Sequence, residues 1–459
     1  MRTYMDWLSV IPPVIAIVVV LWRKEVIVAL LVAIFSAELL QLTLTWSAPA
    51  PATLNTIERI VSVFDSPDNT RLLIFSLMIG ALLAFIRVSG GVAATVESLT
   101  RMGIARGPRS ASLLTSGVGV VVFVESNLSV LTAGILSRGL FDKYQLSRAK
   151  LAYIIDSTSA PVCILILLNA WGAFVLVLLN QYEFALTSAE VLWGSVVFNF
   201  YALLTLATVF ATAATGRYFG PLATSKAGVG VDVHLEEHIT ATKPSYMVVP
   251  LLVMTLGMLG FMLYTGDGDL ANGSGSKSVL YATTIAVIVA YSQMLLGGFE
   301  HIRLVKIAFQ GMGDLLPLVA ILLLALALGR ALGDMGTGAY IAQLVGGNLP
   351  DFLIPAMLFL AGALISFSTG TSWGTFAILI PLGMPLAISL DLPPSLCLAA
   401  ILGGGVFGDH CSPISDTTAV SSIASGCDLL EHVRTQLPYA VTMGVIAFFM
   451  YLVAGFFLI

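Results

Sequence analysis

The chain contains 459 residues, of which 58% are hydrophobic and only 10% are charged. An average soluble domain carries about 25% charged residues, so this composition excludes a soluble globular protein. It also excludes a disordered chain, because disorder requires low hydrophobicity and high charge. The net charge of −5 argues against nucleic acid as a partner. We therefore expect a multi-pass protein of the cell inner (plasma) membrane, with most of its surface facing lipid.

Apolar segments follow one another along the whole chain, and a membrane span needs about 20 apolar residues. The first segment meets a charged turn at 23–25 without a small-residue cleavage site, so it predicts a span and not a signal peptide. Two more polar stretches, 47–71 and 216–245, are expected to be loops. The apolar segments are 7–22, 26–46, 72–89, 110–137, 150–180, 189–215, 246–265, 279–297, 314–332, 352–389, 395–427 and 438–459.

The distribution of basic residues predicts which loops are cytoplasmic, because cytoplasmic loops carry an excess of Lys and Arg. Both sides of segment 110–137 are strongly basic, and a single crossing would not place both in the cytoplasm. This segment is therefore predicted to be a re-entrant hairpin that enters from the cytoplasm. By the same logic, 352–389 is predicted to be a hairpin that enters from outside, with Gly370 and Gly374 near its middle.

The order of these segments predicts an all-α polytopic membrane protein with about ten transmembrane helices, two re-entrant hairpins and both termini outside. Each half runs span, span, span, hairpin, span, span, in opposite orientations, which is an inverted-topology repeat of the kind found in secondary transporters. The first repeat is predicted over 1–220 and the second over 246–459, joined by a cytoplasmic loop at 221–245. Within them, 150–180 and 395–427 are predicted to be broken helices.

Acidic residues within apolar segments are the main candidates for function, since each costs roughly 2.5–3.5 kcal/mol on insertion scales. Asp156 and Asp409 each lie beside hydroxyl residues and near a proline, Pro161 or Pro413, within a long apolar segment. Proline removes a backbone hydrogen bond, and unwound backbone at membrane depth is tolerated where it lines a cavity. Freed carbonyls, hydroxyls and a carboxylate are hard oxygen ligands that suit a sodium ion or a proton.

Polar residues also lie near the turn of each predicted hairpin, in 124–129 and in 366–375. One interpretation is that small polar residues only allow close helix packing, but packing does not explain acids at matching positions in both halves. The candidate ion- and proton-binding residues are therefore Asp156, Asp409, Asp416, Glu125, Asn127, Ser157, Thr158, Thr369, Thr371, Ser372, Ser412 and His410, with Na⁺ expected at Asp156 and Asp409.

For several of these residues a structural role is the alternative. Asp409 and Asp416 lie on either side of Pro413, and each either binds the coupling ion or caps a half-helix. Glu125 either binds an ion or reaches water at a hairpin tip. His410 either relays protons near neutral pH or is a buried neutral histidine.

Other polar motifs are given structural interpretations. Glu38, in the second segment, is expected to pair with another helix. His234 and His238 have the spacing of a metal site on a helix, but such a cluster is more often part of a solvated loop. No cofactor is expected. The cysteines lie in or beside apolar stretches and are predicted to be buried thiols, not disulfides; they are Cys163, Cys397, Cys411 and Cys427.

The sequence resembles the NhaC-type Na⁺/H⁺ antiporter family of the ion-transporter superfamily. The resemblance is carried by GDHCSPISDTT at 408–418, by DKYQLSRAKLAYIIDSTSAPVC at 142–163 and by STGTSWG at 368–374. Family members often show an acid pair followed by an aromatic residue and Asn in the first hairpin, whereas this chain has Glu125-Ser126-Asn127. This departure bears on ion stoichiometry or substrate. The family also includes exchangers of organic acids and amino acids, so membership alone does not fix the substrate.

A buried carboxylate must be protonated or paired with a cation, and a carboxylate that binds either H⁺ or Na⁺ couples their exchange by competition. We therefore predict a secondary active antiporter that exchanges Na⁺ for H⁺ by alternating access, with Na⁺, H⁺ and the lipid bilayer as its partners. Na⁺- or H⁺-coupled exchange of a small organic acid or amino acid is the alternative within the same family. A homodimer also stays open.

Two other classes of protein fit less well. An intramembrane aspartyl protease would require Gly-x-Gly-Asp, and the stretch 405–409 is one residue out of register with that motif. A channel is disfavoured because paired discontinuous helices in inverted halves suit alternating access better than a fixed pore. No enzymatic activity is predicted.

Overall fold

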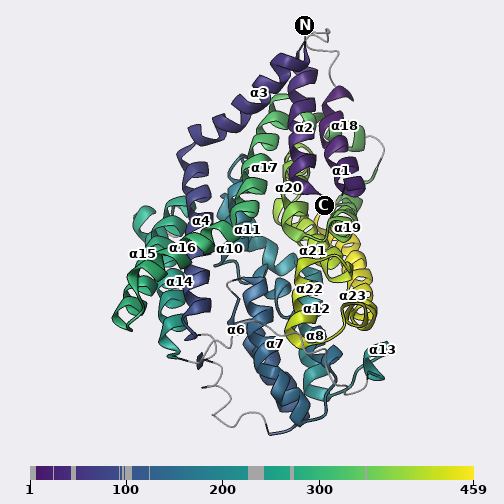
Figure 1. Ribbon diagram of the computed structural model, residues 1–459. Helices are drawn as coiled ribbons and strands as arrows, with labels where there is room; N and C mark the ends of the chain where they lie inside the picture. The colour runs from purple at the N-terminus through teal and green to yellow at the C-terminus, as the bar shows by residue number, and fades with distance from the viewer. Residues whose placement is uncertain are drawn as a thin grey trace.

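Helices form every regular element in the part of the chain that the computed structural model describes (Figure 1). The residues described are 7–23, 25–42, 48–91, 94–95, 98, 106–123, 125–225, 242–268, 273–346 and 349–459. The predicted all-α membrane fold is confirmed, because seven of the described helices are long and apolar enough to cross a membrane and the helices pack against one another.

The first half of the chain contributes long helices and several short ones. In chain order they are η1 (Trp7–Val10), α1 (Ile11–Arg23), α2 (Val26–Gln41), α3 (Pro49–Ser62), η2 (Val63–Asp65), α4 (Pro67–Val88), α6 (Pro108–Val121), α7 (Ser126–Lys143), α8 (Arg148–Ser157), α9 (Ala160–Cys163), α10 (Ala170–Leu179), α11 (Ser188–Phe198), α12 (Phe200–Thr215) and α13 (Gly220–Ala223).

The second half contributes the remaining helices. Its elements are α14 (Ser245–Thr265), α15 (Gly275–Leu296), α16 (His301–Asp314), α17 (Leu316–Asp334), α18 (Thr337–Gly346), η3 (Asp351–Leu353), α19 (Ile354–Thr369), α20 (Ser372–Ser389), α21 (Pro394–Cys411), α22 (Asp416–Ser425) and α23 (Leu429–Leu458).

Seven of the described helices are long and apolar enough to cross a membrane, and nine spans result if each of two bent helix pairs counts as one. The prediction of about ten spans treated α19 and α20 as a hairpin and instead counted the segments that form α1, α2 and α8 to α10, whose helices are shorter. The two bent pairs are α11–α12, with an angle of 45°, and α21–α22, with an angle of 48°. The second break was expected from Pro413; the first, at Asn199, was not.

Among the described helices of ten residues or more, α3, α16 and α18 lie outside the predicted spans. The prediction that 47–71 is a loop is wrong, because α3 occupies most of it. Along α3 the exposed side chains include Leu54, Ile57 and Val61, which share one helix face at i, i+3 and i+7. Mean hydropathy averages this apolar face with the polar one, so an amphipathic helix has a low mean value and is predicted to be a loop.

A cluster of charged side chains fixes α3 to its neighbours. The Arg59 guanidinium donates to Glu38 of α2 at 2.7 Å and to Asp334 of α17 at 2.6 Å. Arg330 of α17 donates to the Ser62 carbonyl at 2.6 Å. The expectation that Glu38 pairs with another helix is confirmed.

Each predicted hairpin segment forms two helices that pack against each other across a short connection, α6 with α7 and α19 with α20. In Figure 1 the α6–α7 pair extends to the lower end of the molecule, whereas α18 and α20 lie toward the end that holds α1 to α3. Glycines allow α19 to approach α21 closely, since a Cβ on Gly404 would lie 2.2 Å from the Phe359 carbonyl oxygen and one on Gly408 would lie 2.3 Å from that of Ala363.

The orientation of the first hairpin can be tested by cysteine labelling. Single cysteines replacing Arg106 and Lys143, which flank α6 and α7, should both react only with a membrane-impermeant reagent added on the cytoplasmic side, because the basic clusters hold both ends inside. The background protein has its native cysteines removed. Labelling of the two positions from opposite faces would make 110–137 a full span and would reject the inverted repeat.

Candidate functional site

Asp156 lies at the end of α8, where the broken helix begins. The chain leaves the helix at Thr158 and resumes in the short helix α9. The carboxylate is buried, and its Oδ2 accepts a hydrogen bond from Nε2 of Gln436 at 2.5 Å. Nε2 of His432 lies 3.3 Å from the same oxygen. Both partners come from α23, so the last helix of the chain closes over the break in the first half.

The network continues from Gln436 to the second broken helix. The same amide nitrogen donates to the carbonyl oxygen of His410 at 3.2 Å, and Nδ1 of His410 lies 3.0 Å from the hydroxyl of Tyr201. Because both oxygens beside the Gln436 nitrogen are acceptors, the amide must present its NH₂ group to them. Asp156 is thus connected through one side chain to the residue that follows Asp409.

Asp409 lies in the last turn of α21 and is buried. Its Oδ2 accepts hydrogen bonds from Oγ of Ser372 at 2.9 Å and from Oγ1 of Thr417 at 3.5 Å. Ser372 begins α20 of the second hairpin, and Thr417 lies in the first turn of α22. Three segments therefore present oxygen atoms to one another: the two halves of the broken helix and the hairpin tip.

The remaining predicted residues of the second half shape this break. Ser412 donates to the Phe367 carbonyl at 2.8 Å and so ties the break to α19. Thr371 caps α20, whereas the hydroxyl of Thr369 bonds within its own helix. Gly370 has φ +69°, and a Cβ there would lie 2.4 Å from the Ile414 carbonyl oxygen. The hairpin turn is therefore in backbone contact with the break.

Two of the predicted acids accept backbone hydrogen bonds at the start of a helix. Glu125 accepts hydrogen bonds from the backbone N–H groups of Asn127 at 2.9 Å and Leu128 at 2.7 Å, so it caps α7. Asp416 is exposed and accepts from the backbone N–H of Thr417 at 2.8 Å. The side chain of Asn127 interacts with the Asp416 carboxylate, which brings the first hairpin to the start of α22.

The hydroxyls after Asp156 are also buried. Thr158 donates to the Ile154 carbonyl at 2.7 Å, and Ser157 lines a small cavity with Tyr201, His410 and Gln436. Four residues of this network were not predicted from the sequence: His432, Gln436, Tyr201 and Thr417. The i, i+4 spacing of His432 and Gln436 was a usable signal, since it places them on one helix face.

Asn169 is a further structural residue that the sequence did not reveal. Its amide nitrogen donates to the carbonyl oxygens of Phe123, Cys163 and Ile166 at 2.8–2.9 Å, and its oxygen caps α10 by accepting from the N–H of Gly172. The side chain thus joins the first hairpin to the break after α9.

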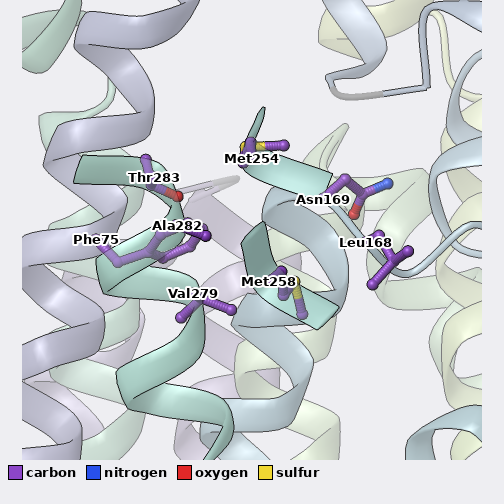
Figure 2. A pocket seen from close by; sticks show the side chains of 8 residues that line it. All are labelled: Phe75, Leu168, Asn169, Met254, Met258, Val279, Ala282 and Thr283. Carbon is purple, nitrogen blue, oxygen red and sulfur yellow. The ribbon is translucent and has the colours of Figure 1, made fainter. Parts of the chain in front are cut away.

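Asn169 also lines a separate pocket between α4, α14 and α15, shown in Figure 2. Phe75, Val279 and Thr283 lie on one side of it and Leu168 and Asn169 on the other. Most of the lining is apolar and none of it is ionisable, so this pocket is not the place for a charged group.

The other sequence-based interpretations can be placed as well. All four cysteines are buried and unpaired, as predicted. His234 and His238 lie outside the described residues. Within the described ranges, no group of three His, Cys, Asp or Glu side chains has the arrangement of a metal site.

Many apolar spans, two helical hairpins and two buried acids at helix breaks define a polytopic ion-coupled transporter. The chain belongs to the Na⁺/H⁺ antiporter family, whose model matches residues 162–456. It is therefore a secondary active antiporter and not an enzyme, and the predicted NhaC-type resemblance is confirmed.

The chain is also similar to individual relatives and, in its fold, to a solved structure. The chain is 33% identical to an uncharacterized Haemophilus influenzae protein, over 98% of this chain and 91% of the relative. It is 34% identical to the malate-2H⁺/Na⁺-lactate antiporter of Bacillus subtilis over 36% of each chain. Its fold is similar to that of the Alcanivorax borkumensis YdaH transporter, with a TM-score of 0.59, 13% identity and 89% of each chain covered.

Proposed function

We propose that the protein exchanges Na⁺ for H⁺ at a centre formed by Asp409 and Asp156. The observation that carries this proposal is the environment of Asp409. Within the described residues, its Oδ1 atom is buried and has no hydrogen-bond partner, while its Oδ2 faces only hydroxyl groups. A buried carboxylate oxygen without a partner is costly unless a proton or cation binds it.

Na⁺ is proposed to bind at Asp409. Hard cations prefer carboxylate, hydroxyl and carbonyl oxygens. The Ser372 and Thr417 hydroxyls next to Asp409 each retain lone pairs that can turn to a cation. The Gly405 carbonyl, 3.3 Å from Oγ of Ser372, adds a further oxygen to the same region.

Asp156 is proposed to hold the exchanged proton, together with His432. The neighbours of its Oδ2 are an amide N–H group and an imidazole nitrogen, not hydroxyl oxygens. Among the described residues its buried Oδ1 has no hydrogen-bond partner, as in Asp409. An N–H group directs its positive hydrogen to the place where a cation would have to bind, so this environment favours a proton over Na⁺. The sequence had predicted Na⁺ at Asp156 as well as at Asp409. The nitrogen partners of Asp156 support H⁺ as its ligand instead.

The two acids can influence each other through Gln436, which contacts both Asp156 and the His410 carbonyl. A proton at Asp156 and a Na⁺ ion at Asp409 are both positive, and such charges repel each other strongly in a medium of low dielectric constant. Na⁺ at Asp409 therefore favours release of the proton, and protonation near Asp156 favours release of Na⁺. In a site that opens to one side at a time, this antagonism produces antiport.

The remaining parts of the proposal concern architecture and surroundings. We propose that 1–220 and 246–459 are inverted repeats joined by 221–245, and that the two hairpins and two broken helices change access to the site. The protein is proposed to reside in the inner membrane and to need no cofactor beyond the transported ions. A homodimer is compatible with this arrangement.

Coupled transport of an organic acid is the second candidate. It is favoured by the similarity to the malate-2H⁺/Na⁺-lactate antiporter, which covers about a third of this chain. The described apolar pocket offers a carboxylate no positive charge, whereas a larger pocket beside α6 and α12 is lined by Arg109 and Lys150.

Transport by purified protein in proteoliposomes with an internal pH indicator distinguishes these candidates. A Na⁺ gradient alone should move protons in the opposite direction, whereas K⁺ should not. Malate, lactate and amino acids are then added one at a time. Proton movement that requires one of these organic compounds would reject simple Na⁺/H⁺ exchange in favour of the second candidate.

A further inference from the structure

Helix α22 connects the proposed Na⁺ site to a basic cluster at the other end of the helix. Its first turn holds Thr417, whose hydroxyl lies 3.5 Å from Asp409, and Ser415 caps it. The helix has ten residues and is thus about 15 Å long. Its last carbonyl oxygens lie beside Arg138 of α7 and Arg148 of α8, which belong to the basic stretch that follows segment 110–137.

These two arginines bind the carbonyl end of α22 directly. Nε of Arg138 donates to the Ala424 carbonyl at 2.8 Å, and its Nη2 donates to that of Ile423. Nη1 of Arg148 donates to the Ser425 carbonyl at 3.0 Å. The last four carbonyls of a helix have no partner within the helix, and this end carries partial negative charge. Two guanidinium groups satisfy both requirements.

The contact between α22 and the first hairpin is also close enough to transmit a displacement. A Cβ on Gly134 of α7 would lie 2.7 Å from the Cβ of Ala424, so the two helices touch without intervening side chains. Arg148 is itself held by Asp142, whose Oδ2 accepts from Nη2 at 2.7 Å. A short helix fixed at one end keeps the position of its other end, because it is rigid over this length.

We propose that Arg138 and Arg148 are positioning residues that hold α22 by its carbonyl end and thereby set the Na⁺ affinity of the Asp409 site. This inference rests on the proposed function. Loss of either guanidinium lets α22 shift and moves the Thr417 hydroxyl away from the cation. The concentration of Na⁺ that gives half-maximal exchange rises, while the maximal rate at saturating Na⁺ is largely kept.

The test compares Arg138→Gln and Arg148→Gln with Lys143→Gln as the matched control. Lys143 is an exposed residue of the same basic stretch, and its ammonium group lies 5.5 Å from the centre of the Tyr144 ring. All three variants lose one positive charge from the same region. Na⁺-dependent proton movement is measured in proteoliposomes over a range of Na⁺ concentrations, after the amount of folded protein has been equalised.

Each arginine variant should raise the half-saturating Na⁺ concentration about fivefold or more, in the usual range for coupling between distant sites. Lys143→Gln should leave it unchanged. Unchanged half-saturation in the arginine variants would overturn the proposal, and so would an equal rise in Lys143→Gln, which would show a general effect of surface charge. A merely structural role would lower the yield or the maximal rate without changing half-saturation.

Arg148→Lys covers the case in which a glutamine variant does not fold. Lysine keeps the charge but loses the second donor of the fork, so a smaller rise in half-saturating Na⁺ is expected, and no rise would overturn the proposal. The wild-type protein tests the proposed function separately. If wild-type proteoliposomes show no Na⁺-dependent proton movement, Na⁺/H⁺ exchange itself is rejected before any variant is compared.

Discussion

Replacement of Asp409 by asparagine is expected to abolish Na⁺/H⁺ exchange. The substitution keeps the shape of the side chain beside Ser372 and Thr417 but removes the charge that would bind Na⁺. Removing one partner of a buried ion pair costs roughly 3–5 kcal/mol, and 1.4 kcal/mol corresponds to a factor of ten. Na⁺ affinity should therefore fall by about a hundredfold or more, which leaves no measurable transport at ordinary Na⁺ concentrations.

The measurement is uptake of labelled Na⁺ into proteoliposomes under two conditions, with a pH gradient and as Na⁺/Na⁺ exchange at equal pH. Asp409→Asn should fail in both, whereas Asp156→Asn should fail mainly when protons must move. Asp391→Asn is the control, because Asp391 is exposed and its φ of 53° suits asparagine equally well. Normal Na⁺/Na⁺ exchange by Asp409→Asn would show that Na⁺ binds elsewhere.

Asp156 and Asp409 could be selected as candidates from the sequence because an acid within an apolar segment is energetically costly. Few acids occur in apolar segments, since each is expensive to insert, and the two that lie beside prolines stand out without any knowledge of the fold. The structure buries both and places them at helix ends. Of the two hydroxyl groups that face Asp409, that of Ser372 was predicted from its place in the paired hairpin, whereas Thr417 was not among the predicted residues.

The partners of Asp156 could not be predicted in the same way. Gln436 and His432 belong to α23, which begins at Leu429, whereas the apolar segment in the sequence begins only at 438. Tertiary contacts decide which helix packs against the end of α8. The sequence around a polar residue near the end of a span does not show which residue that side chain will contact. Glu125 was predicted either to bind an ion or to reach water at a hairpin tip, and the structure adds that its carboxylate caps α7.

The sequence also did not show what the basic side chains contact. Their position in loops predicts the cytoplasmic side statistically, and this says nothing about what each side chain binds. Arg138 and Arg148 contact carbonyl oxygens that lie more than 270 residues away in sequence. Likewise, the amphipathic helix α16 was missed because its apolar and polar faces cancel in an average over the segment.

Replacement of Gly119 by alanine is expected to disturb the close packing of the first hairpin against the broken helix that contains Asp156. Gly119, in the last turn of α6, lies against the buried residue Thr158; a Cβ at position 119 would be 2.2 Å from its Oγ1 and 2.8 Å from its Cβ. Thr158 has little freedom to move away, since its hydroxyl is bonded to the Ile154 carbonyl at 2.7 Å. Gly119→Ala should therefore push α6 away from Thr158, which follows the end of α8 and lies two residues after Asp156.

Gly117 provides a matched control on the same helix, because a Cβ at that position meets no atom within 4 Å. Gly119→Ala should lower stability by about 1–3 kcal/mol through overpacking and should reduce exchange strongly. Gly117→Ala should instead raise stability by roughly 0.5–1 kcal/mol, because alanine is the better helix former. Thermal unfolding in detergent and transport in proteoliposomes measure the two effects. Equal behaviour of the two variants would mean that α6 does not press on the break beside Asp156, and the hairpin would then have no direct means of changing access to that acid.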